Sequence, residues 1–246
     1  MFKCYIMSLR KKISHYELNN TILQEVNTNP YLGLNISNDL KWSHHINSVC
    51  KKASCTLGFI RRNLYHCPQQ TRHTAYITLV RSVLDYGSTI WDPHLKCDIE
   101  KLERIQRQGA RFITNDYKSR EVGSMTKMLE ELDLKPMHQR RKDLRLTFLY
   151  KIVEGLVPAV PSEDYLTPQR NKRRITERTF TDCVSTNAVS KYVSNNSRCF
   201  VIPQGRTDVY NNSFFVKAIT DWNRLDDNIV NAKSLDQFKT NLKTQI

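Results

Sequence analysis

The sequence lacks a continuous apolar run long enough to cross a bilayer. Its two most apolar stretches, residues 75–84 and 144–160, are interrupted by Arg81 and by Lys151 and Glu154. Both fall short of the ~18 consecutive apolar residues that a membrane-spanning helix needs. The first ten residues place their basic side chains after a short apolar stretch, whereas a signal peptide places them before a longer one. We therefore expect an intracellular protein, cytoplasmic or nuclear, with no membrane partner.

Glycine is scarce, and the cysteines do not follow a metal-binding spacing. The 7 glycines are isolated, so none forms a loop that cradles phosphate. The 7 cysteines are an odd number scattered through a chain of 246 residues, which favours reduced thiols. Their densest group with histidine has a gap between Cys50 and Cys55 that does not match structural zinc sites. A small regulator stapled by zinc is thus a weak hypothesis, and we expect no cofactor. The members of this group are Cys50, Cys55, His66, Cys67 and His73.

Adjacent aspartates are almost absent. Nucleotidyl transfer needs two divalent ions held about 3.5–4 Å apart by carboxylates on neighbouring elements. The one adjacent pair of aspartates, Asp226-Asp227, follows Trp222 at the end of a predicted helix, which predicts a helix C-terminal turn rather than a metal site. We therefore expect no catalytic residue in this chain, and no primer extension by it.

Positive charge is abundant where negative charge is missing. Lys and Arg number 38 against 24 Asp and Glu, a net charge of +14, and no Asp or Glu occurs from Leu40 to Leu84. Such a stretch can displace counterions from several phosphates, and the ring of Tyr65 or Tyr76 is a candidate to stack on a base. The alternative is a solvated basic face. The candidate nucleic-acid-binding residues are Lys41, Lys51, Lys52, Arg61, Arg62, Arg72 and Arg81.

A second basic cluster lies in a proline-containing connector, where a disordered tether is at least as good an interpretation as a binding site. Its members are Arg170, Lys172, Arg173, Arg174 and Arg178.

Hydrophobic patterning predicts an α+β fold that is mostly α. Short strands are predicted at residues 2–7, 16–18, 22–26 and 31–36, forming two hairpins with turns at residues 19–20 and 27–30. From Trp42 to Leu64, apolar residues recur every three or four positions, which predicts one long helix with Ser43 as its cap. Further helices are predicted over residues 76–87, 99–113, 125–132, 136–154, 215–222 and from Ser234 onward.

These elements suggest five segments. They are an N-terminal β segment (1–40), a helical domain (41–115), a helical core (116–156), a connector with two strands near residues 191–202 (157–210) and C-terminal helices (211–246). The helix over residues 136–154 has little polar face, so we expect it to be buried nearly all round at the centre of the helical core.

Several stretches together resemble one protein family. The motifs run in the same order as in the reverse transcriptases of non-LTR retrotransposons of the jockey and CR1 type, in the region after the active site. The similarity spans nearly the whole chain, although no single motif is decisive. The matching motifs include Tyr31-Leu32-Gly33-Leu34, Leu57-Gly58-Phe59-Ile60-Arg61-Arg62-Asn63-Leu64, Leu84-Asp85-Tyr86-Gly87, Trp91-Asp92-Pro93, Ala110-Arg111-Phe112-Ile113, Arg140-Arg141 and Trp222-Asn223.

The resemblance implies a fold and a partner. Residues 2–26 would be the last strands of a polymerase palm, residues 31–36 a primer-grip-like strand carrying Tyr31, Leu32 and Gly33, and residues 42–113 a helical thumb. The partners would be an RNA or DNA backbone and the rest of a reverse transcriptase.

The family's aromatic-x-Asp-Asp hairpin has no counterpart here, because none of the residues before Tyr31 is Asp. We therefore expect a truncated RNA-directed DNA polymerase fragment that keeps nucleic-acid binding and lacks catalysis. Mg²⁺ would belong to the missing palm. The rival hypothesis is a helical protein-interaction module that uses the connector and the C-terminal helices.

Overall fold

The computed structural model describes residues 5–6, 17–18, 20–169 and 196–244. Of these residues, 58% are helical and 8% lie in strands, with short strands first and helices after them, so the predicted mostly helical α+β class is confirmed. The chain divides into two compact units, Met1–Arg141 and Lys142–Ile246. The predicted helical core over residues 116–156 is therefore split between the two units.

The strands are short and precede all the helices. Strand β1 (Tyr5–Ile6) pairs in parallel with β4 (Gln24–Glu25), and β2 (Glu17–Leu18) pairs antiparallel with β3 (Thr21–Ile22). Strands β5 (Thr28–Tyr31) and β6 (Leu34–Ser37) form an antiparallel hairpin.

This last hairpin corrects the prediction for residues 27–36. The predicted turn at residues 27–30 is mostly strand β5, and the predicted strand at residues 31–36 is interrupted by a turn at Leu32-Gly33. Both turn residues have positive φ, 47° and 80°. Two such residues form the type of two-residue turn that matches the twist of a hairpin, and glycine adopts it without strain.

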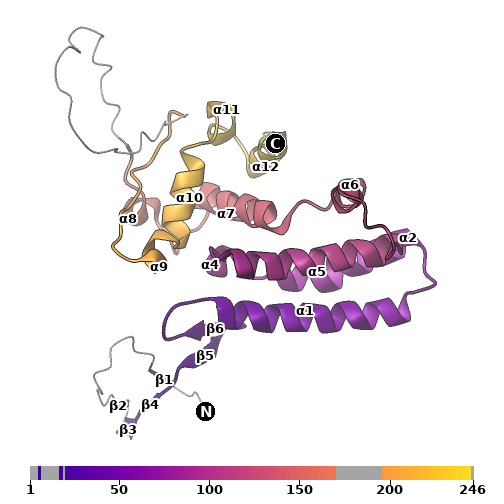
Figure 1. Ribbon diagram of the computed structural model, residues 1–246. Coiled ribbons are helices and arrows are strands. Elements are labelled where there is room, and N and C mark those ends of the chain that lie inside the picture. Colours follow the sequence, from indigo (N-terminus) through magenta and orange to yellow (C-terminus); the bar gives the residue numbers. More distant parts are fainter. Residues whose placement is uncertain (1–4, 7–16, 19, 170–195, 245–246) are drawn as a thin grey trace, which may run out of the picture. The chain divides into compact units, whose positions relative to one another are not determined.

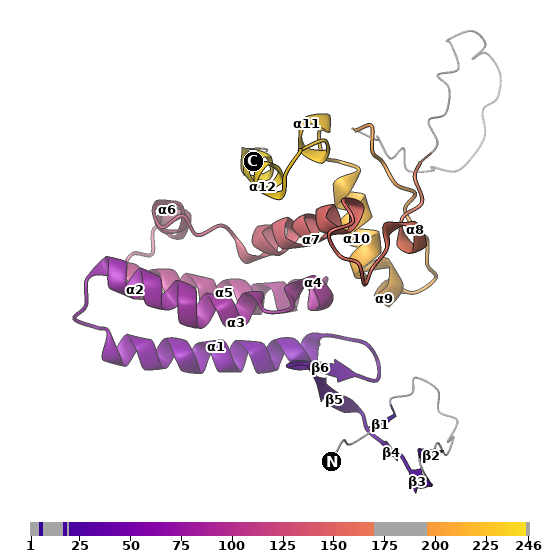
Figure 2. The same cartoon turned by 180° about the vertical axis from the view of Figure 1, so that it is seen from behind.

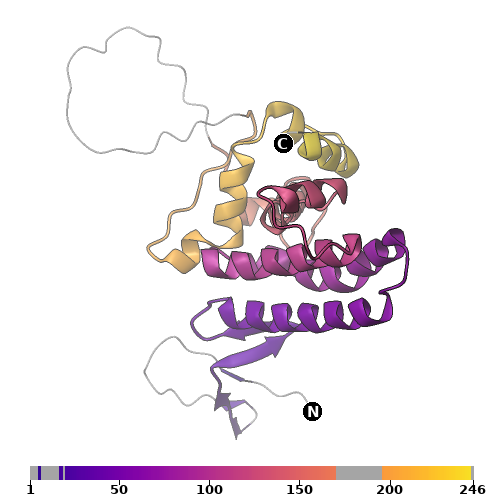
Figure 3. The ribbon, with the colours of Figure 1, turned by 45° about the vertical axis from the view of Figure 1, so that its right-hand side comes forward.

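The first unit is a bundle of helices. Its longest helices, α1 and α5, lie beside the segment formed by α2, η1 and α3 (Figures 1 and 2). The hairpin β5–β6 adjoins the N-terminal end of α1, as the indigo strands of Figure 3 show. The helices are α1 (Ser43–Asn63), α2 (Gln69–Ala75), the π-helix η1 (Tyr76–Arg81), α3 (Ser82–Asp85), α4 (Ser88–Trp91), α5 (Lys96–Thr114) and α6 (Ser124–Glu131).

The core of this bundle fixes the spacing between η1 and α5. Tyr76 is fully buried, and a Cβ added at Gly109 would lie 2.2 Å from its Cε2 atom. Gly109 therefore makes room for the Tyr76 ring. Ser43, the predicted cap of α1, makes no capping bond and instead donates its hydroxyl to Asp98 Oδ2 of α5 at 2.5 Å. This bond ties together the first turns of α1 and α5.

Helix α7 (Met137–Val153) contributes to two cores. Only His138 among its residues is exposed, but nine others are half-buried, so the helix is covered less completely than predicted. The prediction that it is the centre of one core is wrong. Met137 packs in the core of the first unit, whereas Leu146 and Leu149 pack in that of the second.

The second unit has its own core, with Trp222 fully buried. The Tyr150 ring stacks on Phe238 at 4.4 Å, and its hydroxyl donates to the Ala232 carbonyl at 2.8 Å. Of the two strands predicted near residues 191–202, residues 191–195 lie outside the described part, and the remainder forms one bridge, Pro168 to Phe200. The helices here are α8 (Ser162–Tyr165), α9 (Asp208–Asn211), α10 (Phe214–Trp222), α11 (Asp227–Val230) and α12 (Leu235–Thr244).

A search of the described residues finds no helix that is both long and apolar enough to span a membrane.

Candidate nucleic-acid interface

Helix α1 buries one apolar stripe and exposes cations elsewhere. Ile46, Ala53 and Ile60 belong to the buried stripe, as the three- to four-residue spacing predicts. Four cations on the rest of the helix are exposed and form no ion pair or hydrogen bond with any described residue. Because their charges are not neutralised within the described fold, they remain available to an anionic partner. These cations are Lys51, Lys52, Arg61 and Arg62.

The other three predicted binding residues differ from these four. Lys41 is exposed, but its Nζ lies 3.9 Å from a carboxylate oxygen of Asp39. Arg81 is half-buried, and this burial lowers the pKa of its guanidinium, with nearby Arg140 lowering it further. Arg72 is only 8% exposed, so it does not belong to the basic surface. Arg72 lies on the inner side of α2. The sequence does not reveal this side, because α2 has few apolar residues and therefore no clear apolar stripe.

Of the two tyrosines proposed to stack on a base, one is accessible. Tyr65 is 53% exposed just beyond the end of α1, whereas Tyr76 is fully buried in the bundle core. Tyr76 therefore cannot stack on a base in this fold. Burial also raises the pKa of its hydroxyl.

The four free cations of α1 do not point in one direction. Lys52 lines a pocket with Ser82 and Tyr86, on the side of α1 that faces α3. Arg61 lines a different cavity together with Gln108 of α5. Lys52 and Arg61 thus mark two flanks of one helix, which present positive charge over a broad surface.

The turn at Leu32-Gly33, between β5 and β6, is held against the bundle by one tyrosine. The Tyr86 hydroxyl donates to the Leu32 carbonyl at 3.0 Å. A Cβ added at Gly33 would lie 3.2 Å from Tyr86 Cε1, so the turn approaches the ring closely. The side chains of Tyr31 and Leu32 are 60% and 72% exposed. The turn is therefore anchored through its backbone and leaves two large side chains free.

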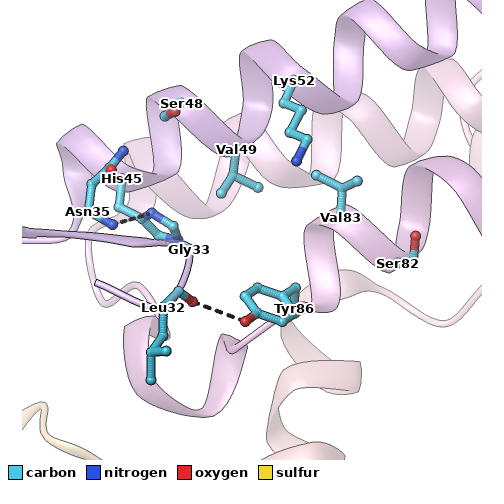
Figure 4. A pocket seen from close by; sticks show the side chains of 10 residues that line it. All are labelled: Leu32, Gly33, Asn35, His45, Ser48, Val49, Lys52, Ser82, Val83 and Tyr86. Atoms are coloured by element: carbon cyan, nitrogen blue, oxygen red, sulfur yellow. Dashed lines mark hydrogen bonds between the residues drawn. The ribbon is translucent and has the colours of Figure 1, made fainter. Parts of the chain in front are cut away.

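A pocket of about 600 Å³ lies between this turn, α1 and α3. Figure 4 shows Lys52 extending toward Val83 above Val49, with the Tyr86 ring below. Lys52 is the one charged side chain among the described residues that line the pocket, since His45 is held neutral. The residues lining the pocket are Leu32, Gly33, Asn35, His45, Ser48, Val49, Lys52, Ser82, Val83 and Tyr86.

His45 connects the hairpin to α1. Its Nδ1 accepts a hydrogen bond from the Asn35 backbone N–H at 3.2 Å, and its ring packs edge-on against Trp91 at 5.3 Å. Burial lowers the pKa of the imidazole, and His44 lowers it further. A neutral ring is also what the bond from Asn35 requires, because protonated Nδ1 would have no lone pair to accept it.

Sequence reasoning did not assign the residues that position this site. Tyr86, Asn35 and His45 were not predicted to contact the turn. The one available signal was the Asp85-Tyr86-Gly87 motif, in which a glycine ends a helix directly after an aromatic residue. Gly87 has a φ of 64°, which bends the chain after Tyr86.

The remaining candidates for chemistry are not assembled into sites. Within the described residues, no three His, Cys, Asp or Glu side chains lie close enough to hold a metal ion. The pair Asp226-Asp227 was predicted to lie in the C-terminal turn of a helix. It lies instead at the start of α11, beyond the end of α10, so this prediction is wrong. Asp227 Oδ1 accepts hydrogen bonds from the Ser197 amide and hydroxyl, both at 2.7 Å, and these bonds lower its pKa. The basic cluster at residues 170–178 lies outside the described part.

Comparisons of this chain with protein-family models, with curated proteins and with solved structures find no match.

Proposed function

We propose that the first unit binds the sugar–phosphate backbone of an RNA–DNA duplex, as the thumb-side part of an RNA-directed DNA polymerase of the non-LTR retrotransposon type. The observation that carries this proposal is the exposed surface of α1, where four cations spread over the outer side and both flanks of the helix have no partner in the described fold. No carboxylate occurs anywhere on α1, α2 or η1 to oppose them. Phosphate contacts from Lys and Arg supply affinity that depends little on sequence.

The docked hairpin supports the same function. Its turn holds Leu32 exposed at the pocket into which Lys52 extends, and the ring of Tyr86, which is 60% exposed, lines the same pocket. An exposed aromatic ring next to a lysine is an arrangement suited to a nucleotide, since the ring can stack on a base while the ammonium contacts a phosphate. The resemblance to a primer grip rests on Tyr31, Leu32 and Gly33 at this turn.

The rival function, a protein-interaction module in the C-terminal helices, would require an apolar face there that is free to bind. Ile219 and Trp222 of α10, and Phe238 and Leu242 of α12, are instead buried together in the second unit. These stripes are used by the fold itself, which weakens the rival hypothesis.

The test is equilibrium binding of a fluorescent RNA–DNA hybrid by the full chain over a range of salt concentrations. Each phosphate contact contributes roughly −0.9 to the slope of log K against log[salt], where K is the association constant. If α1 contributes four contacts, the slope should be about −3.6 or steeper. Two hybrids of unrelated sequence should bind with similar affinity. Addition of Mg²⁺ and deoxynucleotides should give no extension. Binding that is absent, or that does not change with salt, would favour the protein-interaction module.

A further inference from the structure

A second cavity lies on the α5 side of α1. It shares no lining residue with the pocket beside the Leu32-Gly33 turn. This cavity, here called the α1–α5 cleft, has a volume of about 310 Å³. That is room for roughly ten water molecules at ~30 Å³ each. Its polar lining comes from Ser54, Arg61, Gln108, Arg111 and Tyr117, and Gly58 also borders it.

The polar groups of the α1–α5 cleft are mostly unused by the fold. Ser54, Arg61, Gln108 and Tyr117 make no hydrogen bond or ion pair with any described residue. Arg111 makes one long bond, from Nη2 to the Ser119 carbonyl at 3.4 Å. None of the described residues that line the cleft is a carboxylate. Two guanidinium groups and three neutral donors thus border one cavity without an internal anion.

We infer that the α1–α5 cleft binds a phosphate group, held by the guanidinium groups of Arg61 and Arg111 with Gln108 as a further donor. Guanidinium groups match phosphate because they can donate two parallel hydrogen bonds. The inference deepens the proposed function and rests on it for the source of the phosphate, which is either a backbone diester or a terminal monoester of the bound strand.

Two features of the fold oppose an anion here. Arg111 lies in the last turn of α5, where the carbonyl ends of the helix carry partial negative charge. Asp116 is also near enough for Arg111 to lower the pKa of its carboxyl, after the larger effect of hydrogen bonds from Ser119 and Lys118. The helix end disfavours an anion by only about two- to fivefold. Each charge-assisted contact favours it by about 10- to 100-fold, so the guanidinium groups dominate.

The experiment measures hybrid binding by the full chain and by single variants. Arg111→Gln should weaken binding about 10- to 100-fold, and Arg111→Lys should recover only part of the loss because it keeps the charge but not the two-pronged geometry. Gln108→Glu places a carboxylate at the cleft from an exposed position and should also weaken binding by about tenfold or more. The matched control is Gln204→Glu, an exposed position of the second unit with the same change in charge.

Two hybrids distinguish the sources of the phosphate. A loss confined to the hybrid with 5′-phosphates assigns a terminal monoester, and an equal loss with 5′-hydroxyl ends assigns a backbone diester. If the parent binds hybrid in a salt-dependent way and Arg111→Gln and Gln108→Glu bind as tightly as the parent, the cleft is not a phosphate site, while the proposed function stands.

If the parent binds no hybrid at all, the proposed function fails. Titration with inorganic phosphate, followed by nuclear magnetic resonance, then tests whether the α1–α5 cleft binds phosphate. Titration should then shift the backbone amide resonance of Gly58 in the parent but not in Arg111→Gln. Unchanged resonances in the parent would overturn the inference.

Discussion

Replacing the four free cations of α1 by glutamine should remove most of the salt dependence of hybrid binding. Each lost phosphate contact makes the slope of log K against log[salt] less negative by about 0.9, so the four together should change it by roughly 3.6. Between 50 and 200 mM salt, the parent should then lose roughly 100-fold more affinity than the variant. Because the four side chains are exposed and unpaired within the described fold, the circular dichroism of the helices should stay the same. The changes are Lys51→Gln, Lys52→Gln, Arg61→Gln and Arg62→Gln.

The control variant removes four positive charges from the second unit instead of from α1. The second unit offers four exposed cations, and their replacement lowers the net charge equally without touching α1. If this control variant changes the slope as much as the α1 variant does, the binding reflects net charge and not a surface on α1. The control changes are Arg206→Gln, Lys233→Gln, Lys239→Gln and Lys243→Gln.

The largest expected effect on stability comes from a buried ion pair in the first unit. The Arg141 side chain is 0% exposed, and its Nε donates to Asp92 Oδ1 at 2.9 Å. Its Nη1 and Nη2 atoms have no hydrogen-bond partner among the residues that the structure describes. Asp92→Ala should therefore destabilise the first unit by about 3–5 kcal/mol, because it leaves a buried cation without its carboxylate.

Hydrogen exchange of α5 measures this effect within the first unit alone. A loss of about 3–5 kcal/mol should speed exchange of the most protected amides by roughly two to four orders of magnitude. The double variant Asp92→Ala with Arg141→Met removes the unpaired charge and should recover much of the loss. If the double variant exchanges as fast as Asp92→Ala alone, the buried charge is not the cause.

The sequence predicted the long elements of the fold because each follows a regular apolar pattern. Helix α1 begins and ends within one residue of the prediction, and Gly155, with a φ of 67°, follows α7 as expected. The hairpin β5–β6 was misplaced because Asn27–Pro30 carries turn-forming residues. Pro30 is tolerated in β5 because the strand lies at an edge of a two-stranded sheet.

The candidate site was only partly predictable. The absence of carboxylates from Leu40 to Leu84 pointed to α1, but composition does not tell which cations face outward. Arg72 is buried and Arg81 is half-buried, and neither fact is encoded in a local pattern. The α1–α5 cleft depends on two helices that are distant in sequence, so Gln108 and Arg111 carried no signal as partners of Arg61.

The central claim, that α1 lies against the nucleic acid, is tested most directly by a cysteine that the helix already carries. Cys55 is exposed on α1, one turn beyond Lys51 and Lys52. Its rate of alkylation, followed by mass spectrometry of the full chain with and without RNA–DNA hybrid, reports whether this face is covered. We predict that saturating hybrid slows alkylation of Cys55 in the parent and has little effect in the variant that lacks the four cations. Alkylation of Cys55 at the same rate in the free and the fully bound parent would contradict the account.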